Sequence, residues 1–203
     1  MKFYPIFFKN ICFFVYSNYL LLTMRKKWFI INLNKRYFLK VGKKVFQCQI
    51  GLGGLKNSQK KIEGDKTTPI GKWRLKSLYY RPDRVSRPKF KKKNALKIYR
   101  ISKNSGWCDD VNSPFYNKYF NINNFLSLKI NYEKLWREDG AYDLIIVTSH
   151  NAYPVIKNKG SAIFIHCSFS DNRNTSGCVA LKKKDLVFIS KSLSSLTYLD
   201  ISL

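Results

Sequence analysis

The sequence predicts a mainly β domain, because short apolar and β-favouring runs alternate with turn residues along most of its length. Three such runs stand near the start, at residues 28–31, 36–39 and 44–50, and Asn-Lys and Gly-Lys-Lys turns separate them. Two further runs, at residues 142–148 and 162–165, are apolar enough to be buried strands. We therefore expect the core to be built on strands.

The length of 203 residues suits one domain with a short extension, and 45% hydrophobic residues suffice for a real core. We place the extension at residues 1–23 and the domain at residues 24–203. The extension is apolar and free of acids, but Pro, Lys, Asn and Ser interrupt it, and a full membrane span needs ~20 mostly apolar residues. Three readings stay open: an uncleaved anchor, an atypical export signal, or translated upstream sequence with Met24 as the true start.

After the first strands, three glycines at residues 51–54 open a loop. We expect a tight turn there, because no Gly-Lys-Ser/Thr follows as a phosphate-binding loop requires. Residues 67–71, TTPIG, predict a turn that feeds a strand at 72–75, with a structural role or a substrate contact as its two interpretations.

The second half of the chain is expected to hold the short helices. Residues 133–138 predict a helical turn that carries Trp136 and ends near Gly140. A C-terminal amphipathic helix, packed beneath the loop at residue 178, is predicted over residues 182–196 by the spacing of Leu186, Ile189, Leu193 and Leu196.

The formal net charge of +26, from 38 Lys+Arg against 12 Asp+Glu, favours an anionic partner such as nucleic acid, anionic lipid or the carboxylate-rich cell wall. The charge also has a compositional explanation, because the chain is rich in the residues that AT-rich codons encode. The lysine runs at residues 89–93 and 182–184 are typical of solvated faces. We expect no nucleic-acid partner.

The segment from Ser161 to Leu181 holds the candidate chemistry. Its apolar run is a strand that ends at His166, and a polar loop then returns to the tight turn Ser176-Gly177-Cys178. A cysteine nucleophile reacts as the thiolate and needs a base such as His166 to take its proton. Gly177 permits a sharp bend and leaves room for backbone N–H groups to hold an oxyanion. The alternative is a small buried Cys and a structural His.

Three other residues are candidate substrate contacts. Asp109 and Asp110 follow Cys108, and their carboxylates would raise the pKa of that thiol, which argues against Cys108 as the nucleophile. They could instead contact a cationic amine or cap the loop. His150, which follows the strand at residues 142–148, could line the same cleft as His166 or be structural.

The five cysteines include no C-x-x-C pair, so a zinc ribbon or a thioredoxin-like motif is disfavoured. The histidines, together with Cys167 and Cys178, fit no common metal-ligand spacing. We expect neither a metal nor a cofactor. The odd cysteine count leaves at least one thiol without an intramolecular partner, which suits a working nucleophile.

Four motifs, in order over about residues 45–195, resemble the L,D-transpeptidase catalytic domain, the YkuD-type family of cell-wall enzymes. His166 with Thr175-Ser176-Gly177-Cys178 resembles the family's His and its Ser/Thr-x-Gly-Cys element. Residues 63–73, EGDKTTPIGKW, resemble the G-D-x-x-T-P-x-G-x-aromatic stretch. Residues 106–117, with W-C-D-D and Y-N, and residues 135–151, with LWREDGAYD and SHN, resemble one branch of the family.

Better-studied branches place a Gly after the His and an Arg two residues after the Cys, where this chain has Cys167 and Ala180. The branch that this chain resembles ends in G-C-V-A-L, as residues 177–181 do, so the pairing of Cys178 with His166 stands. The substrate-carboxylate contacts of the missing Arg are not carried over.

The resemblance implies curled β-sheets around a cleft with one or two short helices. It also implies acyl transfer from a tetrapeptide stem of peptidoglycan to an amine, through a thioester on Cys178 with His166 as base. Gly177 and Ser176 would support the oxyanion, and a carbonyl near Ser176 would orient His166. We expect a monomer whose partners are stem peptides, with membrane association through the N-terminus.

Two alternatives stay open: an L,D-carboxypeptidase or peptidoglycan hydrolase with the same dyad, and a non-catalytic basic wall-binding module. A papain-type protease is disfavoured, because there the Cys precedes the His. The cell envelope or periplasm is the expected location, or the cytoplasm if the chain starts at Met24.

Overall fold

The computed structural model describes residues 26–90, 96–125 and 129–202, so the expected extension at residues 1–23 and Cys12 lie outside the described residues. The fold is mainly β, as the sequence predicts. Its first three strands form an antiparallel meander: β1 (Lys27–Leu33), β2 (Arg36–Val41) and β3 (Lys44–Gln49). Asn34 and Lys35, both with positive φ, make the first turn, and Gly42 lies in the second.

The largest sheet closes on itself, because β5 pairs with β13 on one side and with β10 on the other. The ring runs β10-β11-β12-β3-β2-β1-β13-β5 and back to β10, and β4 and β6 attach to β5. A closed sheet has no free edge along the ring. The strands beyond the meander are β4 (Leu55–Asn57), β5 (Thr68–Tyr80), β6 (Lys97–Arg100), β10 (Leu144–Thr148), β11 (Phe164–Cys167), β12 (Val179–Leu181) and β13 (Tyr198–Ile201).

Side chains alternate between two buried clusters along the central strands, as the two-residue period of a strand requires. On β10, Leu144 and Ile146 belong to the main core inside the ring. Ile145 and Val147 belong to a second cluster on its outer side. Both faces of β10 are therefore covered, which explains why its sequence is apolar without interruption.

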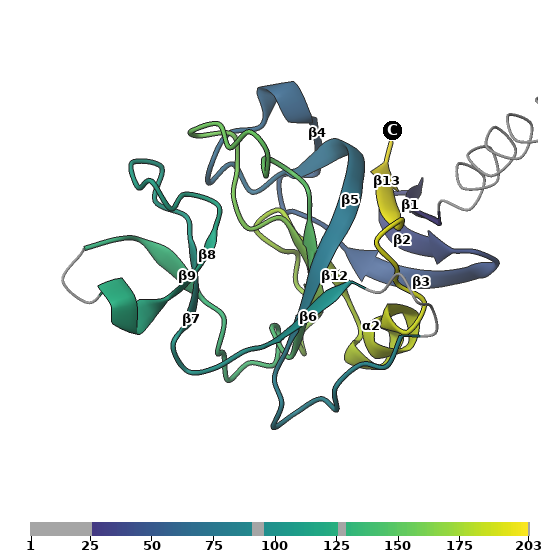
Figure 1. Ribbon diagram of the computed structural model, residues 1–203. Helices are drawn as coiled ribbons and strands as arrows, with labels where there is room; N and C mark the ends of the chain where they lie inside the picture. The colour runs from purple at the N-terminus through teal and green to yellow at the C-terminus, as the bar shows by residue number, and fades with distance from the viewer. Residues whose placement is uncertain (1–25, 91–95, 126–128, 203) are drawn as a thin grey trace, which may run out of the picture.

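A small three-stranded sheet, ordered β8-β7-β9, covers the second cluster. Figure 1 shows it standing apart from the meander and from the helix α2. Its strands are β7 (Ser105–Cys108), β8 (Tyr119–Asn121) and β9 (Tyr132–Lys134), and the 3-10 turn η2 (Ile122–Phe125) connects β8 to β9. A second 3-10 turn, η1 (Ser58–Lys60), connects β4 to β5. Trp107 of β7 packs edge-on against Phe164 of β11, with ring centroids 4.9 Å apart.

Two expected elements differ in the structure. Residues 68–71 already belong to β5, since Thr68 pairs with Leu55 of the edge strand β4. Pro69 is tolerated because it is only the second residue of β5 and pairs there with this edge strand. The expected helical turn at residues 133–138 is wrong, because Glu133 pairs with Trp107 across the small sheet and begins that segment as a strand.

The α-helix α2 (Lys183–Ser190) packs on β10 and β11 through the buried Leu186 and Ile189. It ends earlier than predicted, and the following residues turn toward β13. Leu193 is buried after the helix has ended. No helix within residues 26–90, 96–125 and 129–202 is long and apolar enough to cross a membrane.

Candidate functional site

The strand β11 presents His166 to the outer face of the ring. Phe164 on the same face joins the second cluster, while Ile165 and Cys167 point into the main core. The parallel partner β12 begins directly after Cys178, and its register pairs Val179 with Ile165. Strand geometry therefore brings the loop thiol to the face that carries the imidazole.

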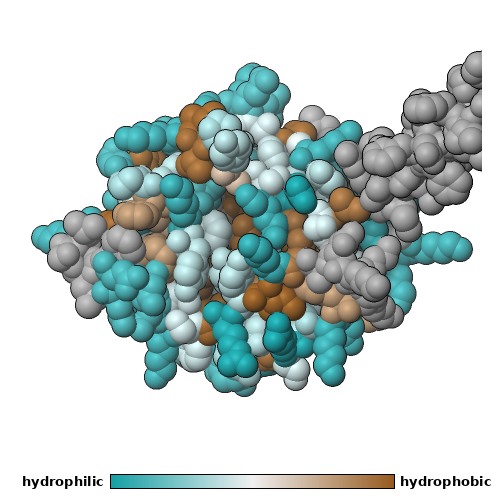
Figure 2. Space-filling model, viewed as in Figure 1, coloured by the Kyte–Doolittle hydropathy of each residue, from teal (hydrophilic) through white to brown (hydrophobic). Residues whose placement is uncertain are grey.

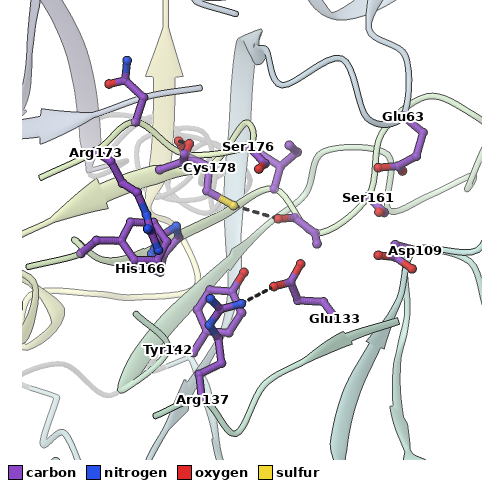
Figure 3. Close-up of a pocket in the computed structure, with 15 residues that line it drawn as sticks. Glu63, Asp109, Glu133, Arg137, Tyr142, Ser161, His166, Arg173, Ser176 and Cys178 are labelled. Atoms are coloured by element: carbon purple, nitrogen blue, oxygen red, sulfur yellow. Dashed lines mark hydrogen bonds and ion pairs between the residues drawn. The ribbon is translucent and has the colours of Figure 1, made fainter. Parts of the chain in front are cut away.

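His166 and Cys178 line one pocket of about 400 Å³, which we call the Cys178 pocket. Figure 3 shows the thiol with His166 to its left and Tyr142 below it. The structure therefore brings together the two residues that the sequence singles out. Ser176 also lines the pocket, from the same loop as Cys178.

The thiol of Cys178 is held between two backbone groups. Its sulfur accepts the N–H of Phe164 at 3.3 Å and donates to the carbonyl of Ala162 at 3.0 Å. The side chain is buried, and burial raises its pKa to about 12. Without substrate, Cys178 is therefore a protonated thiol.

The imidazole of His166 is oriented by its own strand. Nδ1 lies 2.8 Å from the carbonyl oxygen of Cys167, and this oxygen can only accept, so Nδ1 carries the hydrogen of the neutral ring. Burial lowers the pKa of His166 to about 4. The observed partner corrects the expectation of a carbonyl near Ser176. The resting pair is thus a neutral thiol and a neutral imidazole.

The ring of Tyr142 lies edge-on to His166, with centroids 5.3 Å apart and planes at 84°. The guanidinium of Arg137 lies 5.1 Å from the centroid of the Tyr142 ring. Burial raises the pKa of the Tyr142 phenol, which keeps it neutral. Tyr142 thus packs against the His166 ring and restricts its orientation. The sequence did not predict this role, because Tyr142 begins an apolar run that indicates only a buried strand.

The loop that carries Cys178 is locked by its own threonine. The hydroxyl of Thr175 accepts the N–H of Gly177 at 3.1 Å and donates to the carbonyl of Cys178 at 2.6 Å. The backbone N–H of Gly177 is therefore engaged within the loop. Gly177 has a φ of +133°, and an added Cβ would lie 2.9 Å from the carbonyl oxygen of Thr67, so the position requires glycine.

A second threonine ties this loop to the rest of the domain. The hydroxyl of Thr68 donates to the carbonyl of Gly177 at 2.8 Å and accepts the N–H of Gly51 at 2.8 Å. Thr68 is fully buried. The T-T-P stretch thus supports the nucleophile loop from behind, which agrees with the structural one of the two interpretations that the sequence left open.

Charges divide the Cys178 pocket into two halves. Glu63, Asp109 and Glu133 form an acidic half, and Figure 3 places Glu63 and Asp109 together across the pocket from His166. Arg137 and Arg173 lie on the His166 side, although Arg137 reaches across to Glu133 at 3.0 Å. Only 12 residues of the chain are acidic, so three in one pocket is a marked concentration.

The acidic half is held in place by neighbouring side chains. The phenol of Tyr116 donates to Glu63 at 2.5 Å. Burial raises the pKa of Asp109, and the nearby Glu133, Glu63 and Asp110 add to the effect. One carboxylate oxygen of Asp109 is buried without a hydrogen-bond partner. Asp110 does not line the pocket and instead caps the N–H of Asn112 at 2.9 Å.

His150 lies outside the Cys178 pocket, contrary to the expectation of a shared cleft. Its Nε2 lies 2.9 Å from the carbonyl of Lys159, and its ring meets Trp73 edge-on. It lines a separate cavity of about 240 Å³. The strand that precedes His150 does neighbour β11, but β10 and β11 run antiparallel, so the two histidines lie at opposite ends of the pair.

The other described cysteines are buried free thiols: Cys48, Cys108 and Cys167. Burial raises the pKa of Cys48 and Cys167 to about 12, so neither is a reactive thiolate. Within the described parts of the chain, no group of three or more His, Cys, Asp or Glu side chains is arranged to hold a metal ion.

Comparison with protein families decides the relationship of this chain to known proteins. The model of the L,D-transpeptidase catalytic domain, YkuD, matches residues 26–195, which is most of the chain. The chain belongs to the L,D-transpeptidase catalytic domain family. No curated protein and no solved structure gives a significant match.

Membership of the L,D-transpeptidase family supports a cysteine-dependent acyltransferase activity. It agrees with the curled, mainly β architecture around the Cys178 pocket. The matched region contains the whole described ring except β13, together with the small sheet that carries Trp107.

Proposed function

We propose that this chain is a peptidoglycan L,D-transpeptidase that transfers an acyl group from a tetrapeptide stem through a thioester on Cys178. One observation carries the proposal: a buried thiol and a buried imidazole share a pocket with charged groups of both signs. Family membership supplies the class of substrate.

In the first step, His166 takes the thiol proton and the thiolate attacks the carbonyl carbon of the peptide bond that holds the terminal D-amino acid. The tetrahedral intermediate collapses, and the C–N bond breaks. His166 returns the proton to the leaving amine, which leaves a thioester on Cys178. We assign the backbone N–H of Cys178 to the oxyanion, because that of Gly177 is engaged by Thr175.

In the second step, the amine of another stem attacks the thioester carbonyl. His166 accepts a proton from that amine and gives it to the departing sulfur, so a new peptide bond forms and the thiol is restored. We assign the acidic half, through Glu63 and Asp109, to binding the acceptor as an ammonium ion before the attack, since a positive charge there would relieve the repulsion among the carboxylates. The ammonium loses one proton to solvent, and the neutral amine then attacks as described. The contacts of Asp110 and His150 favour structural roles.

Hydrolysis is the second candidate for the same site. Water would replace the amine in the second step, which yields a free tripeptide and makes the chain an L,D-carboxypeptidase. The charged acidic half favours transfer, because water needs no anionic contact. A wall-binding module without catalysis would need neither the buried thiol nor the imidazole beside it.

The test is intact-mass spectrometry of the protein mixed with a tetrapeptide stem, beside Cys178→Ala and His166→Ala. We expect a tripeptide acyl adduct on the unmodified protein and none on Cys178→Ala. Cross-linked product would indicate a transferase, and free tripeptide a hydrolase. A folded protein with no adduct and no turnover would contradict the enzyme proposal.

For the cellular setting we propose action on stem peptides at the cell envelope, by a monomer that associates with the membrane through its N-terminus. In Figure 2, hydrophilic residues are spread over the visible face and not confined to one strip. The formal net charge of +26 supports diffuse attraction to an anionic wall, weakened by salt. Fractionation of cells that produce the full chain tests the location.

A further inference from the structure

Asn117 is a buried side chain that has no part in the chemistry described above. Its exposed fraction is 8%, and its φ of +56° places it in the left-handed region that asparagine tolerates. It lies in the loop between β7 and β8, far in sequence from the thiol. Its amide group nevertheless makes four hydrogen bonds, which use both of its donors and both lone pairs of its oxygen.

The oxygen of Asn117 joins two elements of the site. Oδ1 accepts the indole N–H of Trp107 at 3.0 Å and the backbone N–H of Ala162 at 3.0 Å. The amide nitrogen donates to the carbonyls of His150 and Asn151, at 3.2 Å and 2.7 Å. Asn117 therefore ties the small sheet and the loop after β10 to Ala162, two residues before β11.

Ala162 is the residue whose placement needs this support. Its φ is +50°, a conformation that non-glycine residues rarely adopt and that surrounding contacts must hold. Its N–H is bonded to Asn117, and its carbonyl accepts the thiol hydrogen of Cys178 at 3.0 Å. The backbone N–H and carbonyl of Ala162 thus connect the side-chain amide of Asn117 to the thiol of Cys178.

We propose that Asn117 is a positioning residue for Cys178, acting through Ala162. It holds the Ala162 carbonyl against the thiol, so that the sulfur stays beside the Phe164 N–H in one orientation. A carbonyl that accepts the S–H bond also favours the protonated form, so the thiol stays neutral until substrate enters. The catalytic part of this role rests on the proposed function.

The variant Asn117→Gly removes the amide without straining the backbone, because glycine accepts a positive φ. Asn151→Gly is the matched control. Asn151 also has a positive φ, of +46°, and its side chain makes three hydrogen bonds, to Ile156 and Gly160 in its own loop. None of them reaches Ala162.

The experiment is alkylation of the full chain with iodoacetamide between pH 7 and pH 10, followed residue by residue by peptide mass spectrometry. We expect Asn117→Gly to raise the alkylation rate of Cys178 by about tenfold, the scale of one hydrogen bond. The rates at Cys48, Cys108 and Cys167 should stay unchanged, because the fold is intact. Asn151→Gly should leave Cys178 as in the wild type.

Three results would overturn the proposal: an unchanged rate at Cys178 in Asn117→Gly, an equal rise at Cys178 and the three other buried cysteines, or the same rise in Asn151→Gly. With a tetrapeptide stem, Asn117→Gly should lower kcat by about tenfold and leave KM nearly unchanged, since misplacement of a nucleophile slows the chemical step. If the wild type forms no acyl adduct but the selective alkylation appears, the proposed function fails and the positioning role stands.

Discussion

The hydroxyl of Thr68 lies 2.8 Å from the carbonyl oxygen of Gly177 and donates a hydrogen bond to it across 109 residues of sequence. The same hydroxyl accepts the N–H of Gly51. The residue before the nucleophile is therefore held by a side chain from a distant part of the sequence. The position of Cys178 depends on this buried contact.

Thr68→Val should destabilise the protein and misplace the thiol. Valine keeps the volume but leaves a buried N–H at Gly51 and a buried carbonyl at Gly177 without partners, at ~1–3 kcal/mol each. Urea unfolding measures the loss. Thr197→Val is the control, because Thr197 is equally buried and its hydroxyl accepts the N–H of Ser194, away from the pocket. It should lower stability but leave acyl-adduct formation intact, and a loss of the adduct in both variants would refute the local effect.

Gly177→Ala should abolish most activity while the domain still folds. The added Cβ would press on the Thr67 carbonyl at 2.9 Å and the φ of +133° is unfavourable for alanine, so the loop must shift. A displacement of about 1 Å at a nucleophile costs on the order of 100-fold in rate. Single-turnover kinetics measure this, and circular dichroism checks the fold. Full activity in the variant would show that the loop tolerates the shift.

Stability should fall as the pH falls from about 7 to about 4. Burial lowers the pKa of both His166 and His150 to about 4, so between that value and the ordinary pKa near 6.5 the unfolded chain binds more protons than the folded one. Each histidine contributes up to about 3 kcal/mol, which is present above pH 6.5 and lost on acidification.

Urea midpoints at pH 4.5, 6 and 7.5 measure this dependence, and His150→Gln isolates one contribution. The variant removes one titrating ring, so its midpoint should change less with pH than that of the wild type. Identical slopes for the two proteins would show that His150 does not titrate as the burial of its ring requires.

Asp109→Asn should weaken the use of a cationic acceptor without affecting acylation. The change removes one carboxylate from the acidic half, where burial, with repulsion from Glu133 and Glu63, raises the pKa of Asp109. KM for the amine should rise several-fold, while formation of the acyl adduct stays as in the wild type. Asp110→Asn is the control, because Asp110 does not line the Cys178 pocket. Equal effects of both changes would contradict the assignment.

The sequence predicted the strands that carry the site from local patterns, and it predicted the pair that shares the pocket from their spacing together with the family resemblance. The meander before Gly51 has clear turns, and the run before His166 reads as a buried strand. The prediction from sequence failed where tertiary pairing decides the structure. The residues around Glu133 in the sequence favour a helical turn, but Glu133 pairs with Trp107 in a sheet. The strand at residues 198–201 was also missed, since its partners lie far away in sequence.

The same reason explains what was missed in the site. Thr68, Tyr142 and Asn117 act through contacts that span 109, 24 and 45 residues of sequence, to Gly177, His166 and Ala162 respectively, and no local pattern reports them. His150 was misplaced because the sequence does not give the relative direction of β10 and β11, and their antiparallel pairing puts the two histidines at opposite ends. The W-C-D-D and Y-N motif was noticed, but the bond between Trp107 and Asn117 that joins its two ends was not.

The closed ring has a consequence for how the chain folds. β13 lies between β1 and β5 and pairs in parallel with β1, so Lys27 meets Tyr198 across 171 residues. Closing a loop of that length costs more chain entropy than any other contact of the ring. The strand pairing offsets this cost only when β13 has both β1 and β5 beside it. We therefore expect the ring to close last and slowly, with β1 and β5 passing through a stage in which their edges are open to other chains.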